Sequence, residues 1–175
     1  MTLRDNPASY SVGNRVFDDE GVPTKENVIV DKGMLKTYLH NTSTGKLFKA
    51  KTSGNAGLVT PTPWNVEMDA GNMSRGEVFG EIKKGLYLTN AWYTRFQNYA
   101  KGDFSTIPRD GIFLLKNGEV KRSLKDIRVS DNVLGLLGRI AEVSKERQHV
   151  QWWIEVESCL SPYVLVKDVH ITKSR

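Results

Sequence analysis

Four side chains in this sequence could ligate zinc or form a nucleophile with its base: His40, His149, Cys159 and His170. Catalytic zinc usually takes three protein ligands and a water, whereas a reactive thiolate needs a cationic neighbour or a helix N-terminus. Either chemistry requires the fold to bring these residues together. The spacing of the four residues is therefore the first test of both.

That spacing argues against a metal site built from these residues alone. His149 and Cys159 are ten positions apart, which is roughly 33 Å in an extended segment at about 3.3 Å per residue. Cys159 and His170 would need a tight reversal near Pro162, whereas the pattern of residues 162–171 predicts one continuous strand. No histidine pair has the helical spacing of an H-E-x-x-H site. We expect no self-contained zinc site.

The neighbours of Cys159 favour a buried, unreactive thiol. Glu155 and Glu157 precede it and an apolar strand follows, and both features disfavour the thiolate. A cysteine-dependent enzyme is kept as an alternative; it predicts that Cys159→Ala abolishes an activity that persists in chelator. His170 is interpreted as a polar residue at a strand end. The sequence contains no phosphate-binding glycine loop of the P-loop or dinucleotide type.

Length and composition predict a single domain over residues 1–175. A chain with 39% hydrophobic residues can bury one core, and one cysteine cannot form an internal disulfide, so we expect an apolar core to hold the fold. No apolar run of about 18 residues is present to span a bilayer, and MTLRDNPASY lacks the layout of a signal peptide. We expect a cytoplasmic protein with no membrane partner.

The net charge of +5 raises the question of nucleic acid. Basic residues alternate with acidic ones along the chain, which favours a mixed surface over a phosphate-binding stripe, so no nucleic-acid partner is expected. An aromatic cluster with interleaved basic residues could stack bases or hold peptide side chains, although packing in the core or in a loop is the favoured interpretation. Its members are Trp92, Tyr93, Phe96 and Tyr99, with Arg95 and Lys101.

The elements that must position these residues are mostly strands. Residues 28–39 and 112–124 predict two hairpins, the second around Asn117-Gly118, the preferred type I′ dipeptide. Residues 151–158 alternate as a half-buried strand and residues 163–166 are apolar on both faces, as in a central strand. Residues 52–71, rich in glycine and proline, predict a long loop.

Two helices are predicted. Residues 74–85 begin with Ser74 and Glu77 at capping-box spacing and reach Gly85 as a left-handed C-cap. Residues 131–147 carry apolar side chains at helical spacing after Asp131 as N-cap, and glycines 135 and 138 suggest close packing against that helix. The predicted fold class is α+β and β-rich, with mainly antiparallel sheets and two or three helices packed against them.

Six motifs then stand in a characteristic order and spacing: FDDEGVPTKENVIVDKGMLKTYL, SGNAG, GLYLT, KGDFS, LLKNGEV and SPYVLVKDVHI. Together they resemble the C-terminal domain of the TldD/PmbA family over about residues 17–171. The resemblance implies a subunit of a cytoplasmic zinc metallopeptidase complex that acts on unfolded peptides. The family is also described as a modulator of DNA gyrase, which leaves a gyrase-modulating or nucleic-acid-binding module as the alternative function.

The resemblance also implies a division of labour between homologous subunits. In the TldD branch an H-E-x-x-x-H helix and a cysteine near the C-terminus hold zinc, and the TldE/PmbA branch lacks the histidine motif. That helix and the N-terminal α/β domain are not among these residues, so the chain is not expected to be active alone or to hold a cofactor alone. SGNAG and KGDFS are closer to the TldE/PmbA branch, which suggests the non-catalytic partner of a TldD-like or TldE-like subunit in a homodimer or heterodimer.

Candidate site residues follow from the same resemblance. Cys159 lies near the family cysteine and would be a zinc ligand only with histidines from outside these residues; Leu160 replaces the glycine that follows it in both branches. Two glycine-containing segments could line a peptide channel or subunit interface, where an extended peptide adds to a sheet edge. They are Gly54, Asn55 and Gly57, and Gly102, Asp103, Phe104 and Ser105. Ordinary turn chemistry is the alternative for both segments.

Overall fold

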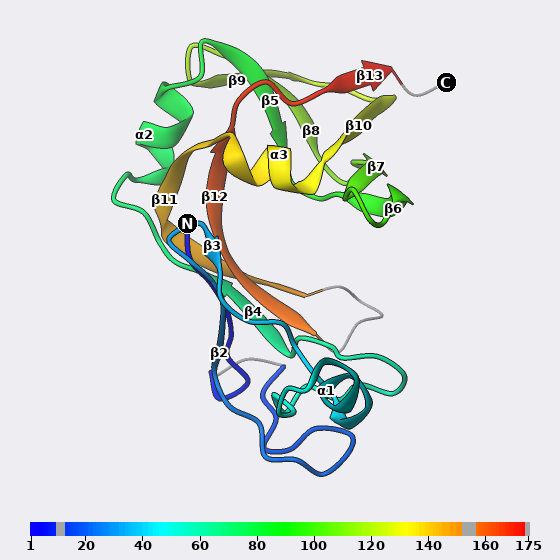
Figure 1. The fold of residues 1–175 in the computed structure, drawn as a ribbon. Helices are drawn as coiled ribbons and strands as arrows, with labels where there is room; N and C mark the ends of the chain where they lie inside the picture. The colour runs from blue at the N-terminus through cyan, green and yellow to red at the C-terminus, as the bar shows by residue number, and fades with distance from the viewer. Residues whose placement is uncertain (10–12, 152–156, 174–175) are drawn as a thin grey trace. The chain divides into compact units, whose positions relative to one another are not determined.

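The computed structural model describes residues 1–9, 13–151 and 157–173. Strands dominate these residues, three short helices accompany them, and the strand pairings are mainly antiparallel (Figure 1). The predicted β-rich α+β fold is confirmed. The chain divides into two compact units, Met1–Ala70 with Arg147–Pro162 and Gly71–Glu146 with Tyr163–Arg175. Within the described ranges, no helix has the length and apolar character that a membrane span requires.

The six-stranded sheet has the strand order β11-β12-β4-β1-β2-β3, in which β1 to β4 belong to the first unit and β11 and β12 contain residues of both units. Strand β1 (Leu3–Asp5) lies antiparallel between β2 (Asn27–Asp31) and β4 (Asn65–Met68), and β3 (Met34–Leu35) extends the sheet beyond β2. Strand β12 (Ser158–Val166) pairs with β4 in parallel and lies beside β11 (Ile140–Gln151). Strand β12 lies between β11 and β4, as a central strand does, although its pairing with β4 covers Ser158–Leu160 and not the predicted residues 163–166.

Local signals in this unit were partly predictable. The hairpin of β2 and β3 is confirmed, with Lys32 (φ 50°) and Gly33 (φ 86°) in its turn, although its second arm is only two residues long. Helix α1 (Thr42–Phe48) was not predicted, because seven residues with a glycine and β-branched threonines have little helix propensity. Asn41 caps it: its side chain accepts a hydrogen bond from the Thr44 amide at 2.8 Å.

The interior of the first unit is polar. Among its described residues only two hydrophobic side chains are buried, Ala56 and Trp64, beside nine buried polar ones: Asp5, Asp18, Asn27, Asn41, Ser53, Asn55, Asn65, Glu67 and Ser158. Within the described part of this unit, buried polar side chains therefore outnumber buried hydrophobic ones, which the expectation of an apolar core does not predict. Hydrogen bonds between these buried polar groups, each costly to leave unmade, help to specify its structure.

The second unit contains two further sheets. One has the order β13 (Ile171–Lys173), β10 (Ile127–Asn132), β7 (Asp103–Ile107) and β6 (Trp92–Asn98). The other has the order β5 (Lys84–Leu88), β8 (Ile112–Lys116) and β9 (Glu119–Ser123). The helices α2 (Arg75–Gly80) and α3 (Val133–Gly138) belong to the same unit. Its buried hydrophobic residues are Val78, Phe104, Ile112, Leu115 and Val129.

Two local predictions in this unit are confirmed. Asn117 (φ 49°) and Gly118 (φ 77°) form the turn of the β8–β9 hairpin, both in the left-handed region that a type I′ turn requires. Ser74 and Glu77 form the predicted capping box of α2. The predicted C-cap at Gly85 is wrong, because α2 ends at Glu81 in a right-handed conformation and Gly85 lies within β5.

The predicted helix over residues 131–147 is wrong beyond its first turns. Helix α3 begins after Asn132, not Asp131, and ends at Gly138, after which Ile140 starts the long strand β11. Two hydrogen bonds hold this strand extended. Gly71 N donates to Ser144 O at 2.9 Å, and Lys145 N donates to Met73 O at 2.7 Å. Tertiary pairing therefore overrides helical spacing. The close packing expected at Gly138 is also absent, since a Cβ there would meet open space.

Three further predictions need correction or restriction. Residues 162–171 do not form one strand, because β12 ends at Val166 and Asp168 has a φ of 52° before β13 begins. The long loop of residues 52–71 contains β4. The half-buried strand predicted for residues 151–158 falls largely on residues 152–156, which lie outside the described part of the chain.

Candidate functional site

The predicted segment around Gly54 is tied to the strand of Cys159 through Trp64. The indole Nε1 of Trp64 donates a hydrogen bond to Gly54 O at 3.0 Å, and the carbonyl of Trp64 accepts one from Ser158 N at 3.1 Å. Trp64 is 3% exposed, and the Arg15 guanidinium lies 4.1 Å from the centre of its ring. Sequence positions that are about a hundred residues apart are thus held in one structure.

Asn55, at the centre of the same segment, has a fully buried side chain. Its Nδ2 donates to Asp5 Oδ2 at 2.6 Å and to Thr62 O at 3.0 Å, while its Oδ1 accepts from Asn27 Nδ2 at 3.1 Å. These bonds use both ends of the amide. Asn55 therefore fixes the loop, and its side chain is not available for contact with a ligand.

Gly54 and Gly57 are required by the same packing. Gly54 has a φ of +75°, and a Cβ there would lie 2.7 Å from Pro23 O. A Cβ on Gly57 would lie 2.5 Å from Thr62 Oγ1. Both glycines permit close approach of neighbouring segments, and Gly54 also supplies a left-handed conformation.

The carboxylate of Asp5 organises this part of the unit. It is fully buried and accepts hydrogen bonds from Asn55 Nδ2 and from the backbone amides of Trp64 and Asn65, the latter two at 2.8 Å. Burial raises the pKa of Asp5, and the nearby Glu67 raises it further, although the three donors act in the opposite direction.

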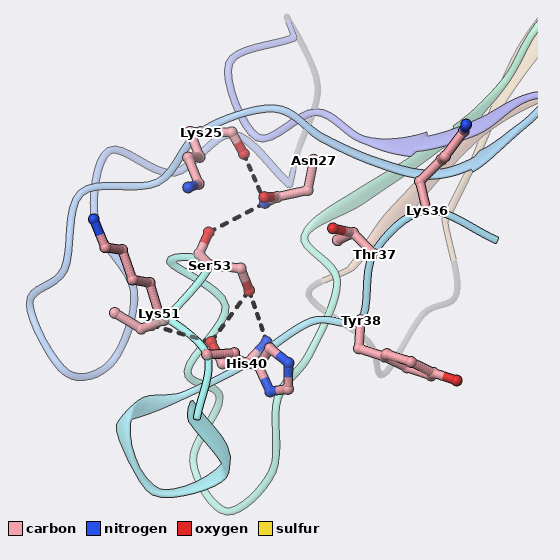
Figure 2. A pocket seen from close by; sticks show the side chains of 10 residues that line it. Lys25, Asn27, Lys36, Thr37, Tyr38, His40, Lys51 and Ser53 are labelled. Atoms are coloured by element: carbon pink, nitrogen blue, oxygen red, sulfur yellow. Dashed lines mark hydrogen bonds between the residues drawn. The ribbon is translucent and has the colours of Figure 1, made fainter. Parts of the chain in front are cut away.

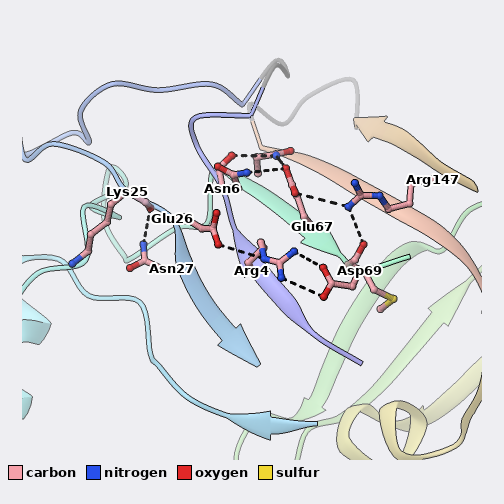
Figure 3. Close-up of polar contacts among 10 residues, drawn as sticks. Arg4, Asn6, Lys25, Glu26, Asn27, Glu67, Asp69 and Arg147 are labelled. Carbon is pink, nitrogen blue, oxygen red and sulfur yellow. Dashed lines mark hydrogen bonds and ion pairs between the residues drawn. The ribbon is translucent and has the colours of Figure 1, made fainter. Parts of the chain in front are cut away.

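A second polar cluster continues along β4 (Figure 3). Asn65 Nδ2 donates to Glu67 Oε1 at 2.9 Å, and Ser158 Oγ donates to Asn65 Oδ1 at 2.6 Å. Arg147 NH1 lies 3.9 Å from Glu67 Oε2. Just beyond the end of β4, Asp69 forms an ion pair with Arg4 of β1. The Nε of Arg4 lies 3.5 Å from Glu26 Oε1.

Cys159 lies within β12, not ahead of it, and its sulfur is half-buried. In the parallel pairing with β4 it stands opposite Val66, one residue from Glu67. Burial raises the pKa of the Cys159 thiol, and the negative charge of Glu67 adds to that shift. The thiol form is therefore favoured, which agrees with the predicted unreactive cysteine.

The described residues do not fit a zinc site by themselves. Among them, no three His, Cys, Asp or Glu side chains are grouped so that they could hold a metal ion. The three histidines have other surroundings. His40 Nδ1 forms a hydrogen bond with Thr44 Oγ1 at 3.2 Å, and His149 is exposed on β11. His170 belongs to the other unit, where its Nδ1 lies 3.1 Å from Ser130 O. No catalytic step through a metal is derived from these groups.

A pocket of about 310 Å³ lies in the first unit beside Ser53, which precedes the predicted segment that begins at Gly54 (Figure 2). Its lining residues are Lys25, Asn27, Lys36, Thr37, Tyr38, His40, Ala50, Lys51, Thr52 and Ser53. Asn27 Nδ2 donates to Ser53 O at 3.1 Å, and Ser53 Oγ accepts from His40 N at 2.7 Å. Asn27 also bonds Asn55, so the pocket wall and the predicted segment share one hydrogen-bond network.

The second predicted segment lies in the other unit, at the turn into β7. Gly102 has a φ of +76° and bonds Asn98 and Val133 through its backbone. Asp103 accepts from Asn132 Nδ2 at 2.9 Å, whereas Phe104 is buried. The hydroxyl of Ser105, also buried, accepts from Arg128 NH1 at 2.9 Å. Turn and packing contacts account for these four residues.

The aromatic cluster on β6 is not core. Tyr93 is 50% exposed, Phe96 41% and Tyr99 83%, and the rings of Phe96 and Tyr99 are 5.0 Å apart. Core packing is therefore wrong for these three side chains, whereas the contact between Phe96 and Tyr99, which follows the strand, fits packing in a loop. The side chain of Trp92 lies outside the described part of the chain.

Comparison with known proteins agrees with this architecture. The family model described as the PmbA/TldA metallopeptidase C-terminal domain matches residues 1–173. The chain therefore belongs to the TldD/PmbA family, and its described sheets represent the C-terminal domain of that family. The resemblance seen in the six sequence motifs is confirmed.

Individual relatives are similar at moderate identity. A metalloprotease of Methanocaldococcus jannaschii is 32% identical over 82% of this chain and 33% of its own length. A zinc metalloprotease TldD homolog of Saccharolobus solfataricus is 30% identical over 83% of this chain and 33% of its own length. The chain thus spans about a third of the curated relatives it matches.

Solved structures show the same fold. TldE from Thermococcus kodakarensis matches with a TM-score of 0.82 and 27% identity, over 97% of this chain and 39% of that one. A proposed modulator of a DNA gyrase from Thermotoga maritima matches with a TM-score of 0.81 and 29% identity, over 98% of this chain and 39% of that one.

The residues that organise the site were not predictable from the sequence. Asp5 and Trp64 gave no motif, and the pocket lysines are separated along the chain among other charged residues. The available signals were weak: Trp64 follows two prolines, and Asn55 lies inside SGNAG. The pairing of β1 with β2 and β4, together with the hydrogen bonds of Asp5 and Asn55, brings distant parts of the chain together here.

Proposed function

We propose that this chain serves as the C-terminal domain of a TldE/PmbA-like subunit, the non-catalytic partner in a cytoplasmic zinc metallopeptidase complex that acts on unfolded peptides. The observation that carries the proposal is the family match over residues 1–173, with TldE from Thermococcus kodakarensis sharing the fold. The two units would act as one functional domain, because the family model covers both.

The residue after Cys159 supports the non-catalytic assignment. Leu160 follows this cysteine where the family resemblance implies glycine. The alternative role, one zinc ligand completed by histidines from outside these residues, is tested by the same experiment as the main proposal.

Exposed apolar side chains support a partner subunit. In the first unit Leu47, Phe48, Leu58 and Val59 are 73%, 67%, 93% and 81% exposed. Large apolar groups left in water commonly mark protein interfaces. We propose that a homologous TldD-like subunit covers part of this surface, and that Gly54–Gly57 and Gly102–Ser105 shape the backbone next to the peptide or the interface.

Reconstitution tests the proposal. The chain is purified alone and after co-expression with a full-length TldD-like subunit, and zinc content and cleavage of an unfolded peptide are measured for each. We expect zinc and cleavage only with the partner, and a Cys159→Ser variant that retains both. Loss of zinc in the Cys159→Ser complex would establish the ligand role instead, and cleavage by the chain alone would refute the non-catalytic assignment.

A second function, modulation of DNA gyrase or binding of nucleic acid, is favoured by two observations. One relative is described as a proposed modulator of a DNA gyrase. The exposed rings of Phe96, on β6, and of Tyr99, just after it, have the character of a base-stacking surface. This function predicts DNA affinity that falls steeply with salt; equal retention of the chain on DNA at low and high salt would exclude it.

A further inference from the structure

We propose that the pocket beside Ser53 is an anion site that binds carboxylate groups, and that it selects acidic peptides. The inference rests on the proposed function, since it names the class of peptide that such a complex would hold. Its basis is the charge of the lining residues, the rigidity of the pocket wall and the size of the pocket.

The lining is positive without compensation inside the pocket. Lys25, Lys36 and Lys51 belong to the lining, with Lys25 and Lys51 on one side and Lys36 on the other (Figure 2), and no Asp or Glu does. The ammonium group of Lys36 lies 3.9 Å from the uncharged Met34 sulfur. The ion pairs that the described residues form involve other cations, namely Arg4, Arg15, Lys121, Arg139 and Arg147. An anion entering the pocket would therefore meet cations that are not already neutralised by a neighbouring carboxylate.

The pocket wall behind these lysines is formed by buried side chains that hydrogen-bond to one another. Asn27 and Ser53 are 8% and 5% exposed, and hydrogen bonds join them to each other and to His40. Ser53 Oγ also donates to His40 O at 3.1 Å, and Thr52 Oγ1 donates to the same carbonyl at 3.0 Å. The backbone that carries the lysines is thus held in place before a ligand binds, which lowers the entropic cost of binding.

The volume and the cation type indicate the ligand class. About 310 Å³ lies at the small end of ligand sites and would take one or two side chains or a chain terminus. Lysine acts as a flexible point charge without the planar fork of arginine, so it recognises negative charge with little demand on geometry. This tolerance suits a surface that receives unfolded peptides of varied sequence, with the hydroxyl group of Thr37 as an additional hydrogen-bonding atom.

The experiment compares two fluorescent peptides of equal length on the full chain by anisotropy. One carries several glutamates and a free carboxyl terminus, and the other carries glutamines and an amidated terminus. A triple variant, Lys25→Gln, Lys36→Gln and Lys51→Gln, is compared with a control, Lys83→Gln, Lys116→Gln and Lys125→Gln. All six lysines are exposed and both variants lose three positive charges, so only position differs.

We expect the wild type and the control to bind the acidic peptide about ten-fold more tightly than the neutral one. The pocket variant should lose this preference while it keeps its affinity for the neutral peptide, and added salt should reduce the preference because exposed charges are screened. Equal loss in both variants, or equal affinity for both peptides in the wild type, would overturn the pocket assignment and leave the peptide function standing.

Two other outcomes separate the remaining possibilities. If the wild type binds neither peptide, alone or with the TldD-like subunit, both the inference and the proposed peptide function fail. If single-stranded DNA binds more tightly than the acidic peptide and depends on the same three lysines, the site takes phosphates, and the acidic-peptide assignment is overturned.

Discussion

Replacing Gly54 with alanine tests whether close packing or only backbone freedom requires a glycine in this segment. Gly54 and Gly21 have nearly the same φ, +75° and +76°. A Cβ on Gly21 would meet nothing within 4 Å, whereas one on Gly54 would lie 2.7 Å from Pro23 O and 3.0 Å from Thr24 Cα. The pair Gly54→Ala and Gly21→Ala therefore differs in steric contact at constant backbone conformation.

The magnitudes can be worked from these contacts. Both variants place alanine in the left-handed region, which costs about 1 kcal/mol of unfolding free energy. Gly54→Ala adds overpacking against backbone atoms that cannot rotate away, a further ~1–3 kcal/mol. With a urea dependence of about 2 kcal/mol per molar, the urea midpoint should fall by roughly 0.5 M for Gly21→Ala and about 1–2 M for Gly54→Ala.

The assay is urea unfolding followed by tryptophan fluorescence, since Trp64 bonds Gly54 directly. An unchanged urea dependence would show that the midpoint shift reports stability rather than a change in the unfolded chain. Equal midpoint shifts in the two variants would refute the reasoning, because they would show that Pro23 and Thr24 move aside without cost and that only backbone freedom requires glycine here.

Three further predictions concern buried and paired groups. Asp5→Asn should lower the unfolding free energy by about 1–3 kcal/mol in urea titrations, because the new side-chain NH2 group would face a buried donor that the carboxylate now accepts from. The control Asp31→Asn on β2 should change the unfolding free energy little. For Asp131, burial acts to raise the pKa, but hydrogen bonds from Arg139 and from the amides of Asn132 and His170 outweigh it, so the pKa in the folded state is lowered. The Asp131 carboxylate contributes about 1 kcal/mol to the unfolding free energy above the pKa that it has in the unfolded chain, and this contribution is lost as pH falls through the folded-state pKa. The difference in stability between the wild type and Asp131→Asn should therefore disappear on acidification, as measured by thermal melts over a range of pH. Asn117→Ala should lower the melting temperature by a few degrees, because alanine tolerates the φ of 49° less well, whereas Asn117→Gly should be neutral by the same melts.

Features set by neighbouring residues could be predicted from the sequence. The Asn117-Gly118 turn, the capping box of Ser74 and Glu77, and the β2–β3 hairpin depend on interactions within a few positions, and the structure contains all three. The predicted fold class followed from the number of such strand signals. Six ordered motifs were also enough to reveal the TldD/PmbA family, which the match over residues 1–173 confirms.

Interactions between distant segments could not be predicted in this way. Residues 140–147 have apolar residues at helical spacing, and pairing with distant segments, β12 on one side and the segment that begins at Gly71, selects the strand instead. The buried carboxylate of Asp5 had no sequence signature, because its three donors come from positions 50 to 60 residues away.

The sequence by itself determined the local turns and caps, the predominance of strands and the family, because these depend on residue order and short-range conformational preference. The tertiary structure decided which polar groups are buried, that Trp64 joins Gly54 to the strand of Cys159, and that Lys25, Lys36 and Lys51 line one pocket. The physical reason is that hydrogen bonds and charge clusters form between groups that the sheet brings together, whatever their separation along the chain.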